Sequence, residues 1–134
     1  MTYAYDDQNI FAKILRGEIP NDTVLETEYA LAFNDIGPQA PIHVLVIPKG
    51  PYVNFDHFVS RASDAEIVGF FKAVQHVSEQ LGLRPGDGGD GYRLLANAGR
   101  DGVQDVLHLH IHLCAGKSLG RMIGRSVMDD GQAV

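Results

Sequence analysis

Three histidines alternate with apolar residues late in the chain, in the segment His108-Leu109-His110-Ile111-His112-Leu113. In a strand, successive side chains point to opposite faces, so the three imidazoles would share one face. Neighbours on that face stand about 6.6–6.8 Å apart, which lets two or three rings engage one phosphate. A neutral imidazole can attack phosphorus, and a protonated one can stabilise charge or protonate a leaving group. The pattern therefore supplies a nucleophile and an acid together.

A metal site is the main alternative for these histidines, because neutral imidazoles are common ligands of zinc. Histidine ligands in such sites usually donate their other ring nitrogen to a carboxylate, and nearby in sequence only Asp101 and Asp105 offer one. We therefore favour the phosphorus chemistry and expect no resident metal or cofactor. The isolated His57 and His76 are interpreted as structural or solvated side chains.

Composition limits the class of protein. The chain has 134 residues, of which 45% are hydrophobic and 21% charged, so we expect one globular domain. Its net charge of −6 argues against nonspecific nucleic-acid binding but leaves a mononucleotide possible. Cys114 is the only cysteine, and neither a basic leader nor an apolar run of membrane-spanning length is apparent. These features favour a cytoplasmic protein that does not bind a membrane.

The elements that must position the triad follow from the periodicity. A first helix is predicted from an Asn9 cap, with an apolar face formed by residues 10, 11, 14 and 15. A second begins at the capping box Ser63-Asp64-Ala65-Glu66 and carries an apolar stripe to Leu81. Strands are predicted at 23–26, 30–34, 42–47, 92–97 and 106–114. Because few connections are helical, we expect an α+β domain with an antiparallel sheet.

The triad segment resembles the signature of the histidine triad nucleotide-binding proteins, in which three histidines alternate with apolar residues, and Cys114 takes its last place. The likeness covers nearly the whole chain. Other matching segments are 10–14 with 18–20, 32–36 with 38–41, 43–48, and 91–94 with Asn97. The resemblance implies the phosphoramidase branch: a homodimer with a sheet of about five antiparallel strands and two helices per subunit. The single domain would span 1–134, with tails at 1–8 and 122–134.

The resemblance also implies roles for individual residues. His110 would attack the α-phosphorus of a purine nucleoside phosphoramidate and form a nucleotidyl-histidine, which water hydrolyses to the nucleoside monophosphate. His112 would contact the phosphate and assist the leaving group, while His108 and His43 would form a hydrogen-bond relay that sets ring orientation. Asp35 would accept hydrogen bonds from the ribose diol. The remaining nucleotide-binding residues implied are Asn97, Gln104, Asp105 and Val103 near the phosphate, and Ile10, Phe11 and Ile36 around the purine.

Several positions depart from the family pattern. Asp105 replaces a frequent serine, so an anion that should repel phosphate stands where a hydroxyl donor is usual. Val103 occupies a position where glycine is common, which affects how closely the loop backbone approaches a ligand. Asn34 replaces a frequent histidine, and Gly50-Pro51 replaces a lysine-histidine pair. The stretch after Arg121 resembles nothing informative.

Other functions stay open at this point. Hydrolysis of dinucleoside polyphosphates would use the same nucleophile. Nucleotide transfer to sugars is disfavoured, because the transferase relatives carry glutamine at the third triad position and this chain has His112. A nucleotide-binding interaction protein with incidental catalysis is the alternative from another class, and the sequence does not separate it from a hydrolase.

Overall fold

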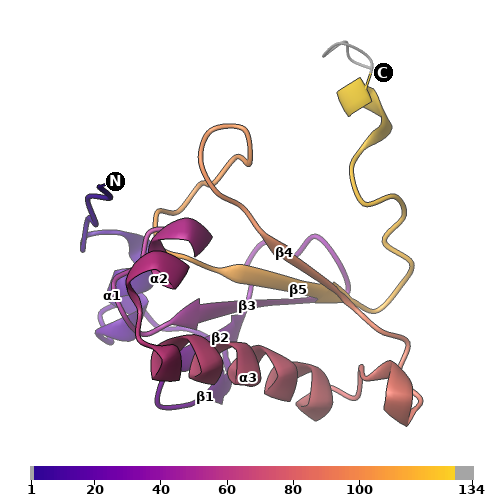
Figure 1. Cartoon of the computed structure of the whole chain (residues 1–134). Helices are drawn as coiled ribbons and strands as arrows, with labels where there is room; N and C mark the ends of the chain where they lie inside the picture. The colour runs from indigo at the N-terminus through magenta and orange to yellow at the C-terminus, as the bar shows by residue number, and fades with distance from the viewer. Residues whose placement is uncertain (1, 129–134) are drawn as a thin grey trace.

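A five-stranded antiparallel sheet with strand order β1-β2-β3-β5-β4 forms the centre of the computed structural model, which describes residues 2–128 (Figure 1). The strands are β1 (Thr23–Glu26), β2 (Ala30–Asn34), β3 (Ile42–Pro48), β4 (Arg93–Ala96) and β5 (Ile111–Ala115). The helices are α1 (Ile10–Leu15), α2 (Phe55–Arg61) and α3 (Asp64–Gln80), with 3-10 turns η1 (Pro85–Asp87) and η2 (Arg125–Met128). This is the α+β arrangement with a five-stranded antiparallel sheet expected from the sequence.

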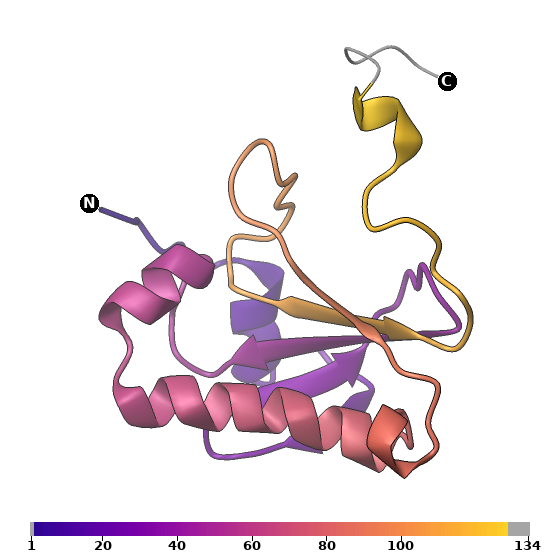
Figure 2. The same ribbon diagram turned by 45° about the vertical axis from the view of Figure 1, so that its right-hand side comes forward.

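The two faces of the sheet carry separate apolar clusters, because side chains alternate along each strand. Along β3, Val44 and Val46 join the cluster beneath α3, whereas Leu45 and Ile47 join the cluster beneath α1. Figures 1 and 2 show α3 along one face and α1 behind the strands on the other. The α1 face is the one that matters for the triad, since His112 lies opposite Leu45 in the β3–β5 pairing.

The register of the sheet also places His43 on the same face as His112. In the antiparallel pair, Leu45 and His112 are direct partners and therefore point to the same face. His43 lies two residues before Leu45 on β3, so it shares that face and stands diagonal to His112. Two imidazoles far apart in sequence are thus brought together beneath α1.

The predicted caps of α1 and α3 are confirmed. The side chain of Asn9 accepts a hydrogen bond from the Ala12 amide at the start of α1. At α3, Ser63 and Glu66 exchange both bonds of a capping box, which satisfies amides that the first helical turn leaves free. The buried stripe of α3 includes Phe70, which is fully covered.

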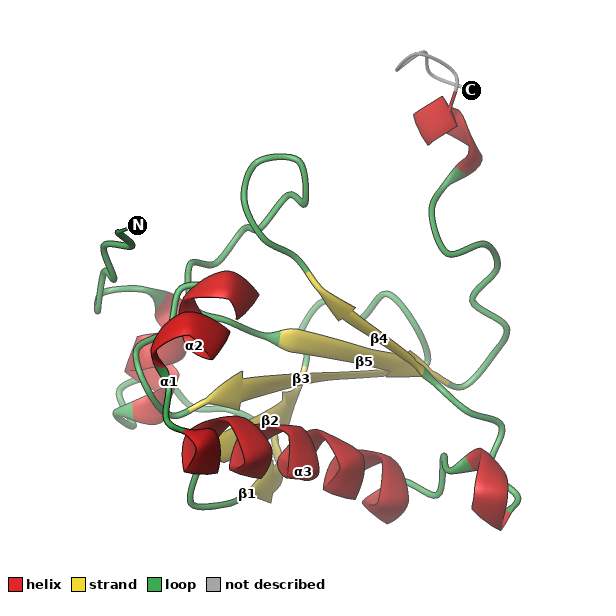
Figure 3. Ribbon diagram, in the orientation of Figure 1, coloured by secondary structure: helices red, strands yellow, loops and turns green. Residues whose placement is uncertain are grey.

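Two predictions about elements were wrong. The expectation of two helices omitted α2, whose Asn54 cap is clear but whose only buried residue is Phe58, so it shows no amphipathic repeat. The last strand was predicted over 106–114 but begins at Ile111, opposite Ala96 at the end of β4. Residues 106–110 instead complete a long loop between β4 and β5, drawn in green in Figure 3.

The remaining global expectations have mixed outcomes. No helix within residues 2–128 is long and apolar enough to span a membrane. The predicted tails, 1–8 and 122–134, reach beyond the described residues at both ends of the chain. Within the N-terminal one, Tyr3 and Tyr5 make side-chain hydrogen bonds to the rest of the domain.

Candidate active site

A cavity of about 350 Å³ lies beside α1, the end of β2, the middle of β3 and the start of β5, in the size range of small-ligand pockets. His112 reaches it from β5 and His110 from the position just before β5, and Asp22, Asp35 and Asp105 add three carboxylates. The rest of its wall is largely apolar. The predicted purine-side residues all line it: Ile10, Phe11 and Ile36.

His110 has one ring nitrogen engaged by the backbone and the other left for chemistry. Its Nδ1 lies 2.8 Å from the carbonyl oxygen of His108. Because a carbonyl only accepts, Nδ1 carries the proton, and the neutral ring keeps its lone pair on Nε2. Only 4% of His110 is exposed, and the Phe11 ring packs edge-on with centroids 5.0 Å apart. The geometry suits a nucleophile held in one orientation.

His112 has the opposite tautomer, fixed by a chain of donors. The Gln39 amide donates to His43 Nδ1 over 3.0 Å, so neutral His43 carries its proton on Nε2. That Nε2–H donates over 2.9 Å to His112 Nδ1, which leaves the proton of His112 on Nε2. The two rings facing the cavity thus differ: His110 offers a lone pair and His112 offers a proton.

Asp35 is held at the rim of the cavity by two contacts. Its Oδ1 accepts the Gly37 amide at 2.8 Å, and its Oδ2 lies 3.4 Å from His43 Nε2. Asp35 therefore caps a turn and joins the relay. A carboxylate has about four lone-pair sites, so these contacts leave acceptor capacity for a ligand.

His108 lies outside the cavity, and this corrects the relay that the sequence suggested. It is fully buried, Tyr5 Oη lies 2.6 Å from its Nδ1, and its Nε2 lies 2.8 Å from the Pro48 carbonyl. His108 contacts His110 through the backbone carbonyl described above. Its ring nitrogens bond to Tyr5 and Pro48 and not to His43. His108 still shares the face of His110, since Phe11 packs against both rings, but its ring is engaged by Tyr5 and the Pro48 carbonyl.

Burial keeps two of the triad rings neutral. Desolvation lowers the pKa of His108 to about 4, opposed by its bond to the Pro48 carbonyl. Desolvation also lowers the pKa of His112 to about 4, helped by repulsion from His110 and His43. Both rings are therefore uncharged near neutral pH, as the tautomer assignments require.

Of the four residues predicted near the phosphate, one lines the cavity and three do not. Asp105 lines the cavity, and its Oδ1 lies 3.8 Å from His110 Nε2. Asn97, Gln104 and Val103 do not line it. The Gln104 amide nitrogen donates to the carbonyls of Val53 and Val106, at 2.6 and 2.9 Å, so it supports the loop and has no spare donor for phosphate.

The backbone conformation at Val103 explains why the family pattern favours glycine at this position. Its φ of +55° lies in the left-handed region, where a β-branched residue is strained. Val103 is 75% exposed, so little burial of its side chain offsets this strain. Asn97 is half-buried just after β4.

Sequence reasoning missed part of the cavity wall. The segment after α1 contributes residues 19–22, and Asn34 joins it by donating to Asp22 Oδ2 at 2.9 Å. Phe33 and Leu45 also line the cavity from β2 and β3. Alternation along these strands, taken with Asp35 and His43, was the signal that could have found the last two.

The metal alternative takes a different form in the structure. Within residues 2–128, potential ligand atoms of Asp35, His43 and His112 lie within 4.8 Å of one another. The three triad histidines do not form such a group, because both ring nitrogens of His108 are bonded to Tyr5 and Pro48. A zinc site on the triad itself is therefore not supported.

The HIT domain family model matches residues 16–119. The chain belongs to this family. A purine nucleoside phosphoramidase of Escherichia coli is 40% identical over 87% of this chain and 94% of its own. An uncharacterised HIT-like protein of Azospirillum brasilense is 57% identical, covering 92% of this chain and 98% of that one. Among solved structures, a HIT family hydrolase from Legionella pneumophila has a TM-score of 0.75 at 34% identity, covering 87% and 100% of the two chains.

Proposed function

We propose that this HIT protein hydrolyses purine nucleoside phosphoramidates, with His110 as the nucleophile at the α-phosphorus. The observation that carries the proposal is the bond from His110 Nδ1 to the His108 carbonyl, which leaves the Nε2 lone pair facing the cavity. The name of the Escherichia coli relative supports the substrate class.

The reaction proceeds in two displacements. First, the Nε2 lone pair of His110 forms a bond to phosphorus, and the bond from phosphorus to the amine nitrogen breaks. That nitrogen leaves with the bonding pair and takes up one proton from solvent, while the neutral His112 ring keeps its own proton and donates a hydrogen bond from Nε2 to the phosphate. Water then displaces His110 from phosphorus, which releases a nucleoside monophosphate and one proton and restores the neutral imidazole.

Binding follows from the cavity's chemistry. Ile10, Phe11 and Ile36 enclose the purine, and Asp35 accepts hydrogen bonds from the ribose hydroxyls. A net charge of −6 supports a small nucleotide ligand over a nucleic-acid polymer or an anionic membrane. Buried Cys114, the only cysteine, supports a reducing, cytoplasmic setting.

We propose further that two chains pair through β4 and α3. β4 is an edge strand, and its Leu94 and Leu95 are 43% and 39% exposed. Apolar surface and unpaired backbone groups therefore occur together on β4, and helix α3 also exposes Val68 and Phe71. Light scattering should give twice the 14.6 kDa of one chain, and Leu95→Lys should halve that mass. Val59→Lys on α2 is the control and should keep the dimer mass. A wild-type mass equal to that of one chain would refute the dimer.

The proposed reaction is tested by turnover of adenosine and guanosine phosphoramidates with and without a strong chelator. His110→Ala should lower kcat at least about a thousandfold, because the nucleophile is lost. His76→Ala, which alters an exposed histidine on α3, should leave kcat unchanged. Mass spectrometry after an alkaline quench should find the nucleotidyl group on His110. Loss of activity with the chelator would indicate a metal mechanism instead, and tight nucleotide binding without turnover would favour an interaction protein.

A further inference from the structure

The N-terminal segment reaches the triad at His108, which does not line the cavity. Tyr5 Oη lies 2.6 Å from His108 Nδ1, and the two rings meet edge-on with centroids 5.6 Å apart. The two residues are separated by 103 positions in the chain. Tyr5 does not line the cavity, so it has no contact with a ligand there.

The partner of His108 Nε2 determines which residue donates in the hydrogen bond between Tyr5 and His108 Nδ1. His108 Nε2 faces the Pro48 carbonyl at 2.8 Å and must carry the proton, since a carbonyl cannot donate. His108 Nδ1 is therefore an acceptor, and the Tyr5 hydroxyl is the donor. Burial raises the pKa of Tyr5 and lowers the pKa of His108, so a protonated hydroxyl faces a neutral ring.

The same residue, His108, holds the nucleophile through its backbone. Its carbonyl accepts the Nδ1–H of His110 at 2.8 Å, and this bond fixes both the orientation and the tautomer of that ring. A rotation of residue 108 would move the carbonyl with it. The two bonds on the His108 ring, from Tyr5 and to Pro48, oppose that rotation.

We propose that Tyr5 is a positioning residue for the nucleophile, acting through His108 to hold His110 with its Nε2 lone pair toward the cavity. This inference rests on the proposed role of His110. It makes the segment before α1 part of the machinery that orients the triad.

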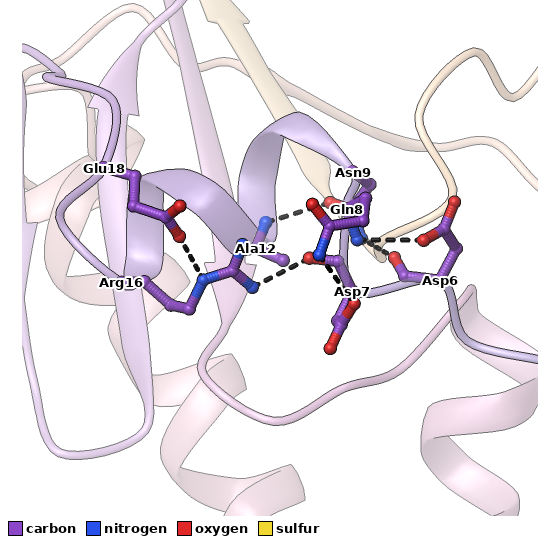
Figure 4. A network of polar contacts seen from close by, with 7 residues as sticks. All are labelled: Asp6, Asp7, Gln8, Asn9, Ala12, Arg16 and Glu18. Carbon is purple, nitrogen blue, oxygen red and sulfur yellow. Dashed lines mark hydrogen bonds and ion pairs between the residues drawn. The ribbon is translucent and has the colours of Figure 1, made fainter.

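The backbone that follows Tyr5 is anchored, as a positioning role requires (Figure 4). The side chain of Asp6 accepts the Gln8 amide at 2.9 Å, and the Asp6 carbonyl accepts Asn9 Nδ2 at 2.8 Å. Arg16 at the end of α1 donates from Nη1 to the Asp7 carbonyl at 2.8 Å and also pairs with Glu18. These contacts join the segment to α1, whose Phe11 packs against His110.

Tyr3 provides a matched control in the same segment. Its hydroxyl donates to Asp56 Oδ2 at 2.7 Å, and its ring stacks on His57 with centroids 5.0 Å apart. Tyr3→Phe therefore removes a tyrosine hydroxyl bond that ties the segment to α2 without touching the triad. Tyr5→Phe removes the equivalent bond to His108.

The kinetic arm compares the two variants on a purine nucleoside phosphoramidate. Loss of one neutral hydrogen bond is expected to lower kcat about 3- to 10-fold in Tyr5→Phe. KM should stay within about twofold, because Tyr5 does not contact the substrate and its binding is therefore unchanged. Tyr3→Phe should match wild type in both constants. Equal kcat for Tyr5→Phe and wild type, or equal losses in both variants, would overturn the inference.

The spectroscopic arm needs no activity, so it separates this inference from the proposed function. Nitrogen-15 NMR of labelled histidines reports the tautomer of each ring. In wild type, His108 should be the Nε2–H form and His110 the Nδ1–H form. Tyr5→Phe should shift the His108 Nδ1 signal, which loses its hydrogen-bond donor, and should mix the tautomers of His110, whose carbonyl partner is no longer held; Tyr3→Phe should change neither. Wild type that turns over no phosphoramidate would refute the proposed reaction, while unchanged His108 and His110 signals in Tyr5→Phe would refute the positioning role.

Discussion

Replacing Asp105 with asparagine removes a negative charge beside His110, the proposed nucleophile, while preserving side-chain size. Asp105 Oδ1 lies 3.8 Å from His110 Nε2, so the carboxylate faces the space that a nucleotide phosphate must enter. In a near-attack arrangement the phosphorus lies about 3–3.5 Å from the attacking nitrogen, which puts carboxylate and phosphate charges about 6 Å apart. The two like charges repel, and Asp105→Asn should therefore tighten binding of a nucleoside monophosphate.

The exposure of Asp105 sets the size of this effect. At about 6 Å the repulsion amounts to about 0.7 kcal/mol in water and about 3 kcal/mol at an effective dielectric constant of about 20. The Asp105 side chain is 83% exposed, which selects the aqueous value. This value holds for one unit of phosphate charge; a nucleoside monophosphate carries about 1.5–2 charges near neutral pH, so its dissociation constant should be about 5- to 10-fold lower.

Calorimetric titration with GMP and AMP, at low ionic strength and again at about 1 M salt, measures the effect, because the screening length falls to about 3 Å at the higher value. The gain in Asp105→Asn should be present at low salt and nearly absent at high salt. Asp101→Asn is the control, since that side chain is 92% exposed and pairs with Arg100 away from the nucleophile. Unchanged or weaker binding in Asp105→Asn, or a gain that persists at high salt, would contradict the electrostatic reasoning.

Three further predictions concern stability. Val103→Gly should raise the free energy of unfolding by up to about 1 kcal/mol, because it relieves a φ of +55°, whereas Gly99→Ala at +72° should lower it; urea unfolding measures both, and a loss in the glycine variant would count against strain. Since the folded pKa of His108 is about 4, below its unfolded value near 6.5, the unfolded state binds more protons between these values, so stability should fall by up to about 3 kcal/mol as pH drops through that window; a flat profile would refute this. Phe58→Ala should cost about 3–5 kcal/mol because the ring is fully buried, whereas Val59→Ala, 44% exposed on the same helix, should cost little.

The elements that the sequence predicted well are those whose signals are local. The capping box at Ser63 and the apolar stripe that follows it identify α3, since both depend on residues within a few positions of one another. Helix α2 escaped prediction because burial of Phe58 alone leaves no period to detect. The cavity wall from residues 19–22 was missed for another reason: its approach to β2, through the bond from Asn34 to Asp22, is a tertiary contact without a repeating pattern.

The triad shows the same division more sharply. Alternation correctly predicted that His110 and His112 would face the same cavity. It did not reveal that His108 is held outside the cavity, because its surroundings depend on Tyr5, 103 residues earlier, and on the Pro48 carbonyl. Local spacing thus identified the histidines that line the cavity, while the contacts that orient them required the tertiary structure.

Spacing alone would also make the two cavity-facing rings equivalent, and the structure shows why they are not. His110 Nδ1 meets an acceptor, the His108 carbonyl, and so its Nε2 presents a lone pair. His112 Nδ1 meets a donor, the Nε2–H of His43, and so its own Nε2 presents a proton. A phosphate between them would meet a nucleophile on one ring and a hydrogen-bond donor on the other. The opposite roles of two identical side chains therefore arise from one backbone carbonyl and one histidine of β3, neither of which the triad spacing specifies.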